Sequence, residues 1–182
     1  MLLADGTAHQ TVQIAHETNG GPTLADLDQF GRSIAWIGDL DGDGIASDIV
    51  VGAVGDDTGG NGRGAVYVIS LLADGTAYRT VHIADETNGG PTLEDGGQFG
   101  GSVAWIGDVD GDGMASDIVV GAFSNPSGGV GRGCVYVLSL LPDGSAHRAV
   151  QIASSVNGGP ALANNDNFGV AVAWIGDMDG DG

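Results

Sequence analysis

The stretch that decides the fold is FGRSIAWIGDLDGDGIASDIVVGA, residues 30–53, which returns almost unchanged as FGGSVAWIGDVDGDGMASDIVVGA, residues 99–122. The copies are spaced 69 residues apart, and Trp36, Trp105 and Trp174 all follow this spacing. Self-similarity at a fixed period indicates that one structural unit is arrayed in several copies. The 182 residues therefore hold about 2.6 units.

Each unit contains four short apolar runs, rich in Val, Ile and aromatic residues, which predict β-strands. In the first complete unit they are residues 33–39, 48–54, 64–70 and 79–85. No segment shows a sustained helical period. The two middle runs are apolar on both faces, as expected for strands that are covered on both sides. We therefore predict an all-β fold of β-propeller blades with four antiparallel strands each, forming an incomplete propeller, rather than a β-sandwich with accidental repetition.

The repeat predicts where the units begin and end. Residues 1–29 are expected to form the outer strand of a partial blade, residues 30–98 and 99–167 two complete blades, and residues 168–182 the start of a further blade. Unpaired strand edges and apolar faces favour association. The expected partners are therefore neighbouring blades, either from outside this chain or from self-association.

Each unit also carries a loop rich in aspartate between its first two predicted strands. The loops are DLDGDGIASD at residues 39–48, DVDGDGMASD at residues 108–117, and DMDGDG at residues 177–182. Carboxylates at positions 1, 3 and 5 of a tight loop converge on one point, and Gly at position 6 permits the sharp turn. Like charges about 4 Å apart repel by about 4 kcal/mol per pair at an effective dielectric of about 20. Such a cluster favours a bound cation, and hard oxygen ligands favour calcium over zinc or copper.

Such loops have two other interpretations. Asp and Gly are good turn residues in their own right, but a threefold recurrence at a fixed period favours metal binding. An EF-hand needs flanking helices and a bidentate Glu at position 12, where this chain has Val50 or Val119 inside a predicted strand. The EF-hand is therefore excluded.

Together, these motifs resemble the FG-GAP repeat, which is the blade of the integrin alpha-subunit propeller and of many bacterial extracellular proteins. The resemblance rests on residues 30–53 followed by GRGAVYV at 62–68, and on residues 99–122 followed by GRGCVYV at 131–137. It implies that calcium binds between the first two strands of each blade. It also implies a secreted or cell-surface protein with a role in binding, adhesion or scaffolding, toward a protein or glycan ligand.

The resemblance further implies a set of metal ligands. They are Asp39, Asp41, Asp43, the carbonyl of Ile45 and Asp48 in the first loop, Asp108, Asp110, Asp112, the carbonyl of Met114 and Asp117 in the second, and Asp177, Asp179 and Asp181 in the third. The family's closing acid stands at position 9, where this chain has Ser47 and Ser116, and the nearest acids are Asp48 and Asp117 at position 10. The closing ligand is therefore Ser47 or Asp48, and Ser116 or Asp117. The third loop stops at position 6, so a weak or empty site is expected there.

Charge narrows the possible partners. With 24 acidic residues against 5 Lys and Arg, the net charge is −19, which argues against nucleic acid and against an anionic membrane surface. No apolar run reaches the length of a membrane span. Cys134, the single cysteine, stands in the repeat column of Ala65 and is predicted to be buried and unreactive.

No catalytic motif is apparent. The histidines exchange with Tyr or Gln between units, which predicts exposed positions on outer strands rather than catalysis or metal binding. No chemistry-bearing constellation occurs once rather than in every unit. We therefore expect a binding or scaffolding segment without a catalytic site. The alternative is an accessory propeller module of an extracellular enzyme, for example one acting on polysaccharides, whose catalytic residues lie outside this chain.

Overall fold

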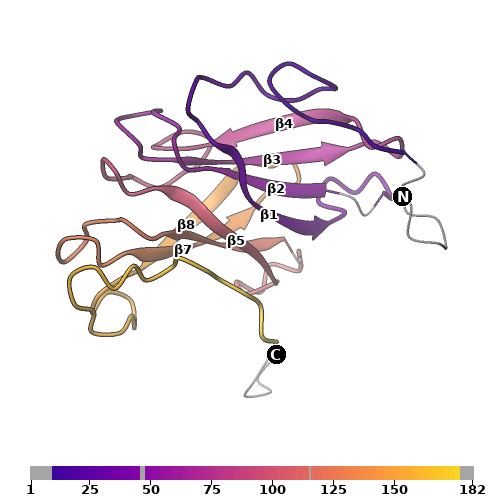
Figure 1. Ribbon diagram of the computed structural model, residues 1–182. Helices are drawn as coiled ribbons and strands as arrows, with labels where there is room; N and C mark the ends of the chain where they lie inside the picture. The colour runs from indigo at the N-terminus through magenta and orange to yellow at the C-terminus, as the bar shows by residue number, and fades with distance from the viewer. Residues whose placement is uncertain (1–9, 46–47, 115, 177–182) are drawn as a thin grey trace, which may run out of the picture.

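The computed structural model describes residues 10–45, 48–114 and 116–176, and within them every regular element is a β-strand (Figure 1). The strands are β1 (Phe30–Gly38), β2 (Asp48–Ala53), β3 (Ala65–Leu71), β4 (Ala77–Ile83), β5 (Phe99–Gly107), β6 (Asp117–Ala122), β7 (Cys134–Leu140) and β8 (Ala146–Ile152). They form two four-stranded antiparallel sheets, in the orders β1-β2-β3-β4 and β5-β6-β7-β8. The all-β fold predicted from the repeat is confirmed, and the two sheets have the plan of propeller blades.

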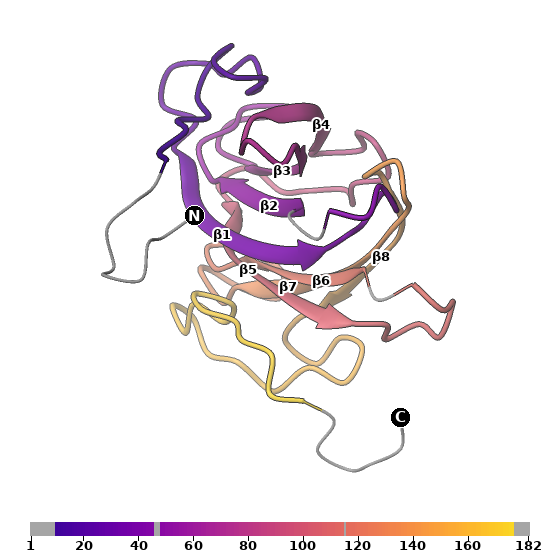
Figure 2. The ribbon, with the colours of Figure 1, turned by 90° about the vertical axis from the view of Figure 1, so that its right-hand side faces the viewer.

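The two sheets lie one above the other, with β1 running beside β5 (Figure 2). A hydrophobic core fills the space between them: Val50, Val66 and Val68 of the first sheet belong to the same buried cluster as Ile118 and Val120 of the second. The opposite face of the first sheet has its own cluster around Tyr67 and Ile69, against which Ile14 and Leu24 pack. β3 is therefore buried on both faces, as its continuous apolar sequence predicts.

The Phe-Gly pair at the start of β5 fixes the contact between the sheets. Phe99 is fully buried, and its backbone N–H donates to the carbonyl of Arg63 at 2.9 Å. Gly100 has φ +88, and its carbonyl accepts a hydrogen bond from the Ser33 hydroxyl at 2.8 Å. A Cβ on Gly52 would lie 2.0 Å from that same carbonyl. The glycines at these columns are thus required by the close approach of one sheet to the next.

Polar contacts within each unit hold the segment that leads to the next unit. Arg63 extends from the loop between β2 and β3 to residues that follow β4. Its Nε lies 2.7 Å from Asp95 and its Nη1 lies 2.8 Å from Asp85. Arg132, at the same repeat position in the second unit, donates to the side chains of Asn164 and Ser154. The Arg of the Gly-Arg-Gly motif therefore braces the connection that leads out of each sheet.

β1, the first strand of the first sheet, carries exposed apolar side chains. Ile34 and Trp36 on β1 are 62% and 53% exposed, and the Trp36 ring lies edge-to-face with Trp105 of β5 at 5.9 Å.

Cys134, at the start of β7, is fully buried, and burial raises the pKa of its thiol. The prediction of a buried cysteine is therefore confirmed.

The partial units differ from the expected strands. Among the described residues, 10–14 form no strand, and the tract from Phe168 to 176 makes a single parallel bridge, between Phe168 and Gly133. Among the described residues, neither tract pairs with a strand of its own blade, and a strand without a partner cannot form a hydrogen-bonded ladder. No helix in the described residues is long and apolar enough to cross a membrane.

Candidate metal centre

The two complete aspartate loops lie at the same end of their sheets, between the first and second strands. In the first, carboxylate oxygens of Asp39, Asp41 and Asp43 lie within 4.8 Å of one another. Backbone N–H groups hold this arrangement: Gly44 donates to Asp39 at 3.0 Å, and Ile45 donates to Asp43 at 2.7 Å. The loop sequence thus folds its alternating carboxylates onto one side by hydrogen bonds to its own backbone.

The second loop repeats this arrangement with more contacts. Asp108 accepts hydrogen bonds from the N–H groups of Gly111, Asp112 and Gly113 at 2.8–3.1 Å. The N–H of Met114 donates to Asp112 at 2.7 Å. Two groups of possible metal ligands overlap here, and both contain Asp110. One group consists of Asp108, Asp110 and Asp117, and the other of Asp110, Asp112 and His147.

The position 10 acids are buried at the start of the second strand of each sheet. The two oxygens of Asp48 accept hydrogen bonds from the N–H of Leu40 at 2.8 Å and of Leu71 at 3.3 Å, and burial raises the pKa of this carboxyl. Asp117 accepts from the N–H of Val109 at 2.6 Å. Only Asp117 of these two acids joins a group of possible ligands within the described residues. Asp48 instead ties the loop to the end of β3.

Ser116, at position 9 of the second loop, bonds to a strand. The hydroxyl of Ser116 donates to the carbonyl of Leu140 at 3.0 Å, so its side chain bonds to the end of β7. Its N–H donates to the carbonyl of Met114 at 2.8 Å. Ser47 lies outside the described residues, as do Asp177, Asp179 and Asp181 of the third loop.

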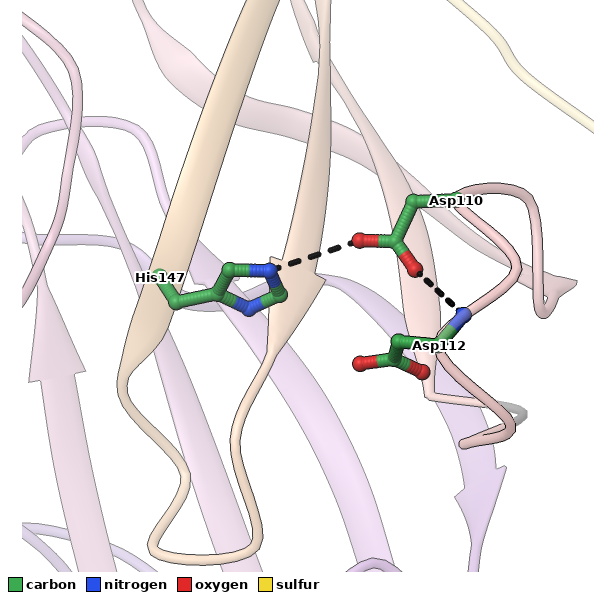
Figure 3. Close-up of side chains that lie close together, drawn as sticks. All are labelled: Asp110, Asp112 and His147. Carbon is green, nitrogen blue, oxygen red and sulfur yellow. Dashed lines mark hydrogen bonds and ion pairs between the residues drawn. The ribbon is translucent and has the colours of Figure 1, made fainter.

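Side chains from the outer strand reach the central aspartate of each loop. In the first unit, the hydroxyl of Tyr78 donates to Oδ2 of Asp41, and Nη2 of Arg79 lies 3.5 Å from the same oxygen. The hydrogen bond from Tyr78 is the main reason why the pKa of Asp41 lies below its ordinary value. In the second unit, Nε2 of His147 lies 3.4 Å from Oδ2 of Asp110 (Figure 3). A hydrogen bond from Ser139 is the main cause of the lowered pKa of Asp110.

A second polar cluster occurs in the first sheet. Oδ2 of the buried Asp56 lies 3.0 Å from the hydroxyl of Tyr67 and 3.0 Å from Nε2 of His82, whose ring stacks on Tyr67. His82 is half-buried, so the exposed position predicted for it is wrong. The cluster occurs in this form in the first unit, because the second unit has the neutral pair Asn125 and Gln151 at these two positions.

The Asp56 cluster should make the free energy of unfolding depend on pH in the acid range. Although burial opposes ionisation, hydrogen bonds from His82 and Thr58 outweigh it, and the pKa of Asp56 lies well below its ordinary value. The carboxylate therefore contributes stability above its unfolded pKa of about 3.9, and this is lost as the pH falls toward the folded value. Urea unfolding of the wild type and of the double variant D56N/H82Q, which copies the second unit, should show a flatter decline below pH 4 in the variant. Parallel declines would contradict this assignment.

The chain is similar in sequence to a known integrin alpha subunit. No protein-family model matches the chain. Integrin alpha-PS2 of Drosophila melanogaster is 35% identical in an alignment 164 residues long, which covers 83% of this chain and 10% of that protein. The chain therefore spans about a tenth of the length of the relative it matches. The match confirms, as distant homology, the resemblance drawn from the Phe-Gly and aspartate-loop motifs.

Proposed function

The chain is a distant homologue of integrin alpha-PS2, and from this homology and its paired aspartate loops we propose that it is a calcium-stabilised propeller segment of a secreted or cell-surface protein. Its role is binding, adhesion or scaffolding, with a protein or glycan as ligand. The proposed blades are residues 30–98 and 99–167, and residues 1–29 and 168–182 belong to the neighbouring blades. No catalytic site is proposed in this chain.

The observation that carries this proposal is the convergence of carboxylates in both loops. Asp39, Asp41 and Asp43 place oxygens within 4.8 Å of one another, and Asp108, Asp110 and Asp117 do the same. A divalent cation would relieve the repulsion within each group, which amounts to about 4 kcal/mol for each pair at about 4 Å. Carboxylate and carbonyl oxygens on a flexible loop fit calcium. The chain's net charge of −19 adds a general attraction for cations.

The proposed ligands of the first site are the three aspartates of its cluster with the carbonyl of Ile45, and those of the second are Asp108, Asp110 and Asp112 with the carbonyl of Met114. Asp117 is proposed to close the second site, because it joins the group of possible ligands whereas Ser116 bonds to β7. Asp48 is proposed to close the first. When bound, calcium would supply charge neutralisation and fix the loop conformation, while the sheets supply the scaffold.

The exposed apolar residues of the inner strand support the proposed neighbours. Ile34 and Trp36 on β1 are both more than half exposed. In a propeller, the inner strands of all blades face a common axis. Further blades, from a longer chain or from a second copy, are the proposed cover for these side chains.

Metal content tests the proposal directly. Protein dialysed against millimolar calcium should hold about two calcium ions per chain above the dialysate by elemental analysis, since the dissociation constants of calcium loops range from about 10⁻⁹ to 10⁻³ M. A tenfold excess of magnesium should not displace them, because magnesium demands a more rigid octahedral site. Retention of no calcium under these conditions would overturn the proposed function.

A further inference from the structure

The second aspartate loop has an imidazole beside it, at the position where the first loop has a phenol. His147 is the second residue of β8, and the loop between β5 and β6 lies opposite it (Figure 3). Nε2 of His147 lies 3.4 Å from Oδ2 of Asp110, and ligand atoms of His147, Asp110 and Asp112 all lie within 4.8 Å of one another. The imidazole and the two carboxylates thus surround one small volume.

The first loop shows what stands at this position in the other unit. Tyr78 occupies the column of His147, and its hydroxyl donates a hydrogen bond to Asp41. A neutral phenol satisfies the carboxylate but is a poor metal ligand. An imidazole can instead place a lone pair on a metal that the carboxylates also bind. The two loops therefore share their aspartates and differ in the donor that faces them.

Imidazole nitrogen changes which metal a site prefers. Calcium takes oxygen ligands, whereas imidazole suits zinc and other first-row transition metals. Two ligands on a tetrahedral zinc ion, each bonded at about 2.0–2.1 Å, lie about 3.3 Å apart. The observed 3.4 Å between His147 Nε2 and Asp110 Oδ2 matches that separation. The remaining two positions would be taken by Asp112 and by water.

We propose that His147, with Asp110 and Asp112, makes the second loop a site for a transition-metal ion of the zinc class, which competes there with calcium, while the first loop stays selective for hard cations. This inference rests on the proposed function, because it assumes that the aspartate loops bind metal. The competing interpretation is an ion pair between protonated His147 and Asp110, with no role in metal binding.

The chain supplies its own matched variants for the test. H147Y gives the second loop the residue of the first, and Y78H gives the first loop the residue of the second. H16Q removes an exposed histidine that lies outside both loops and serves as the control for surface binding. Each protein is titrated with zinc chloride by calorimetry, and with cobalt chloride, whose visible absorption reports nitrogen ligation.

The wild type and H16Q should bind one zinc ion tightly, H147Y should bind it about tenfold or more weakly, and Y78H should gain a second site. Zinc binding that is unchanged in H147Y, or is weakened equally in H16Q, would overturn the inference. Calcium titration of the same proteins separates the two proposals. If calcium binds at two sites while zinc binding is independent of His147, the inference alone fails. If calcium binds at neither loop, the proposed function fails, whatever zinc does.

Discussion

Removal of calcium is expected to lower the melting temperature of this chain by about 10–20 °C. Each site held at about 100 times its dissociation constant contributes about 2.7 kcal/mol of stability, so two sites contribute about 5 kcal/mol. For a chain of this size, 1 kcal/mol corresponds to about 2–4 °C. The physical cause is local. Without the cation, the carboxylates of Asp39, Asp41 and Asp43, which lie within 4.8 Å of one another, repel.

Thermal melts followed by circular dichroism, in calcium and in excess chelator, measure this shift. The double variant D41A/D110A is the control, because it removes the central carboxylate of each loop and should melt at the same temperature in both solutions. A wild-type melting temperature that does not respond to chelator would show that the loops are stable without a cation.

Gly89→Ala is expected to destabilise the fold by about 2–5 kcal/mol in total. Gly89 has φ +80, and a Cβ there would lie 1.6 Å from the carbonyl of Ala146 on β8 of the next sheet. The left-handed conformation costs an L-residue about 1–2 kcal/mol, and the overpacking adds about 1–3 kcal/mol. The neighbouring carbonyl of Asn88 accepts a hydrogen bond from the N–H of Ala146 at 3.0 Å, so the backbone has little room to move.

Gly158 is the matched control for this variant, since it occupies the same repeat column. Its φ is +79, but a Cβ there would meet nothing within 4 Å. Gly158→Ala should therefore cost only the conformational part, about 1–2 kcal/mol. Urea unfolding of both variants isolates the contact between the sheets. Equal losses in the two variants would contradict the stacking of one unit on the next.

The strands were largely predictable from the sequence because each apolar run is short and bounded by turn residues. In the first unit three strand ends moved by two or three residues and the others by at most one, and two of the larger shifts have identifiable reasons. β1 begins at Phe30 rather than at residue 33, because Gly31 adopts φ +92 and lets the strand continue through an irregularity in its register. β4 ends at Ile83 rather than at residue 85, because the carboxylate of Asp85 caps the following turn by accepting from the N–H of Leu93 at 2.7 Å.

The aspartate clusters could be foreseen because their members lie two residues apart in one loop. The side chains that reach them from the outer strands could not, because Tyr78 and His147 are separated from their aspartates by 37 residues of chain. Exchange of Tyr and His within one column resembles the variation of an exposed surface. Paired changes between the units are more informative than single ones. Asp56 and His82 of the first unit are both replaced in the second, by Asn125 and Gln151, as expected for residues in contact.

Each complete loop is expected to bind one calcium ion independently of the other, and calorimetric titration of four proteins tests this most directly. The wild type should show two sites, D41A and D110A one each, and the double variant D41A/D110A none at comparable affinity. Each single variant should still melt at a higher temperature in calcium than in chelator, because its other loop is intact. Two sites retained in D41A or in D110A, or no site in the wild type, would contradict the assignment of calcium to these loops.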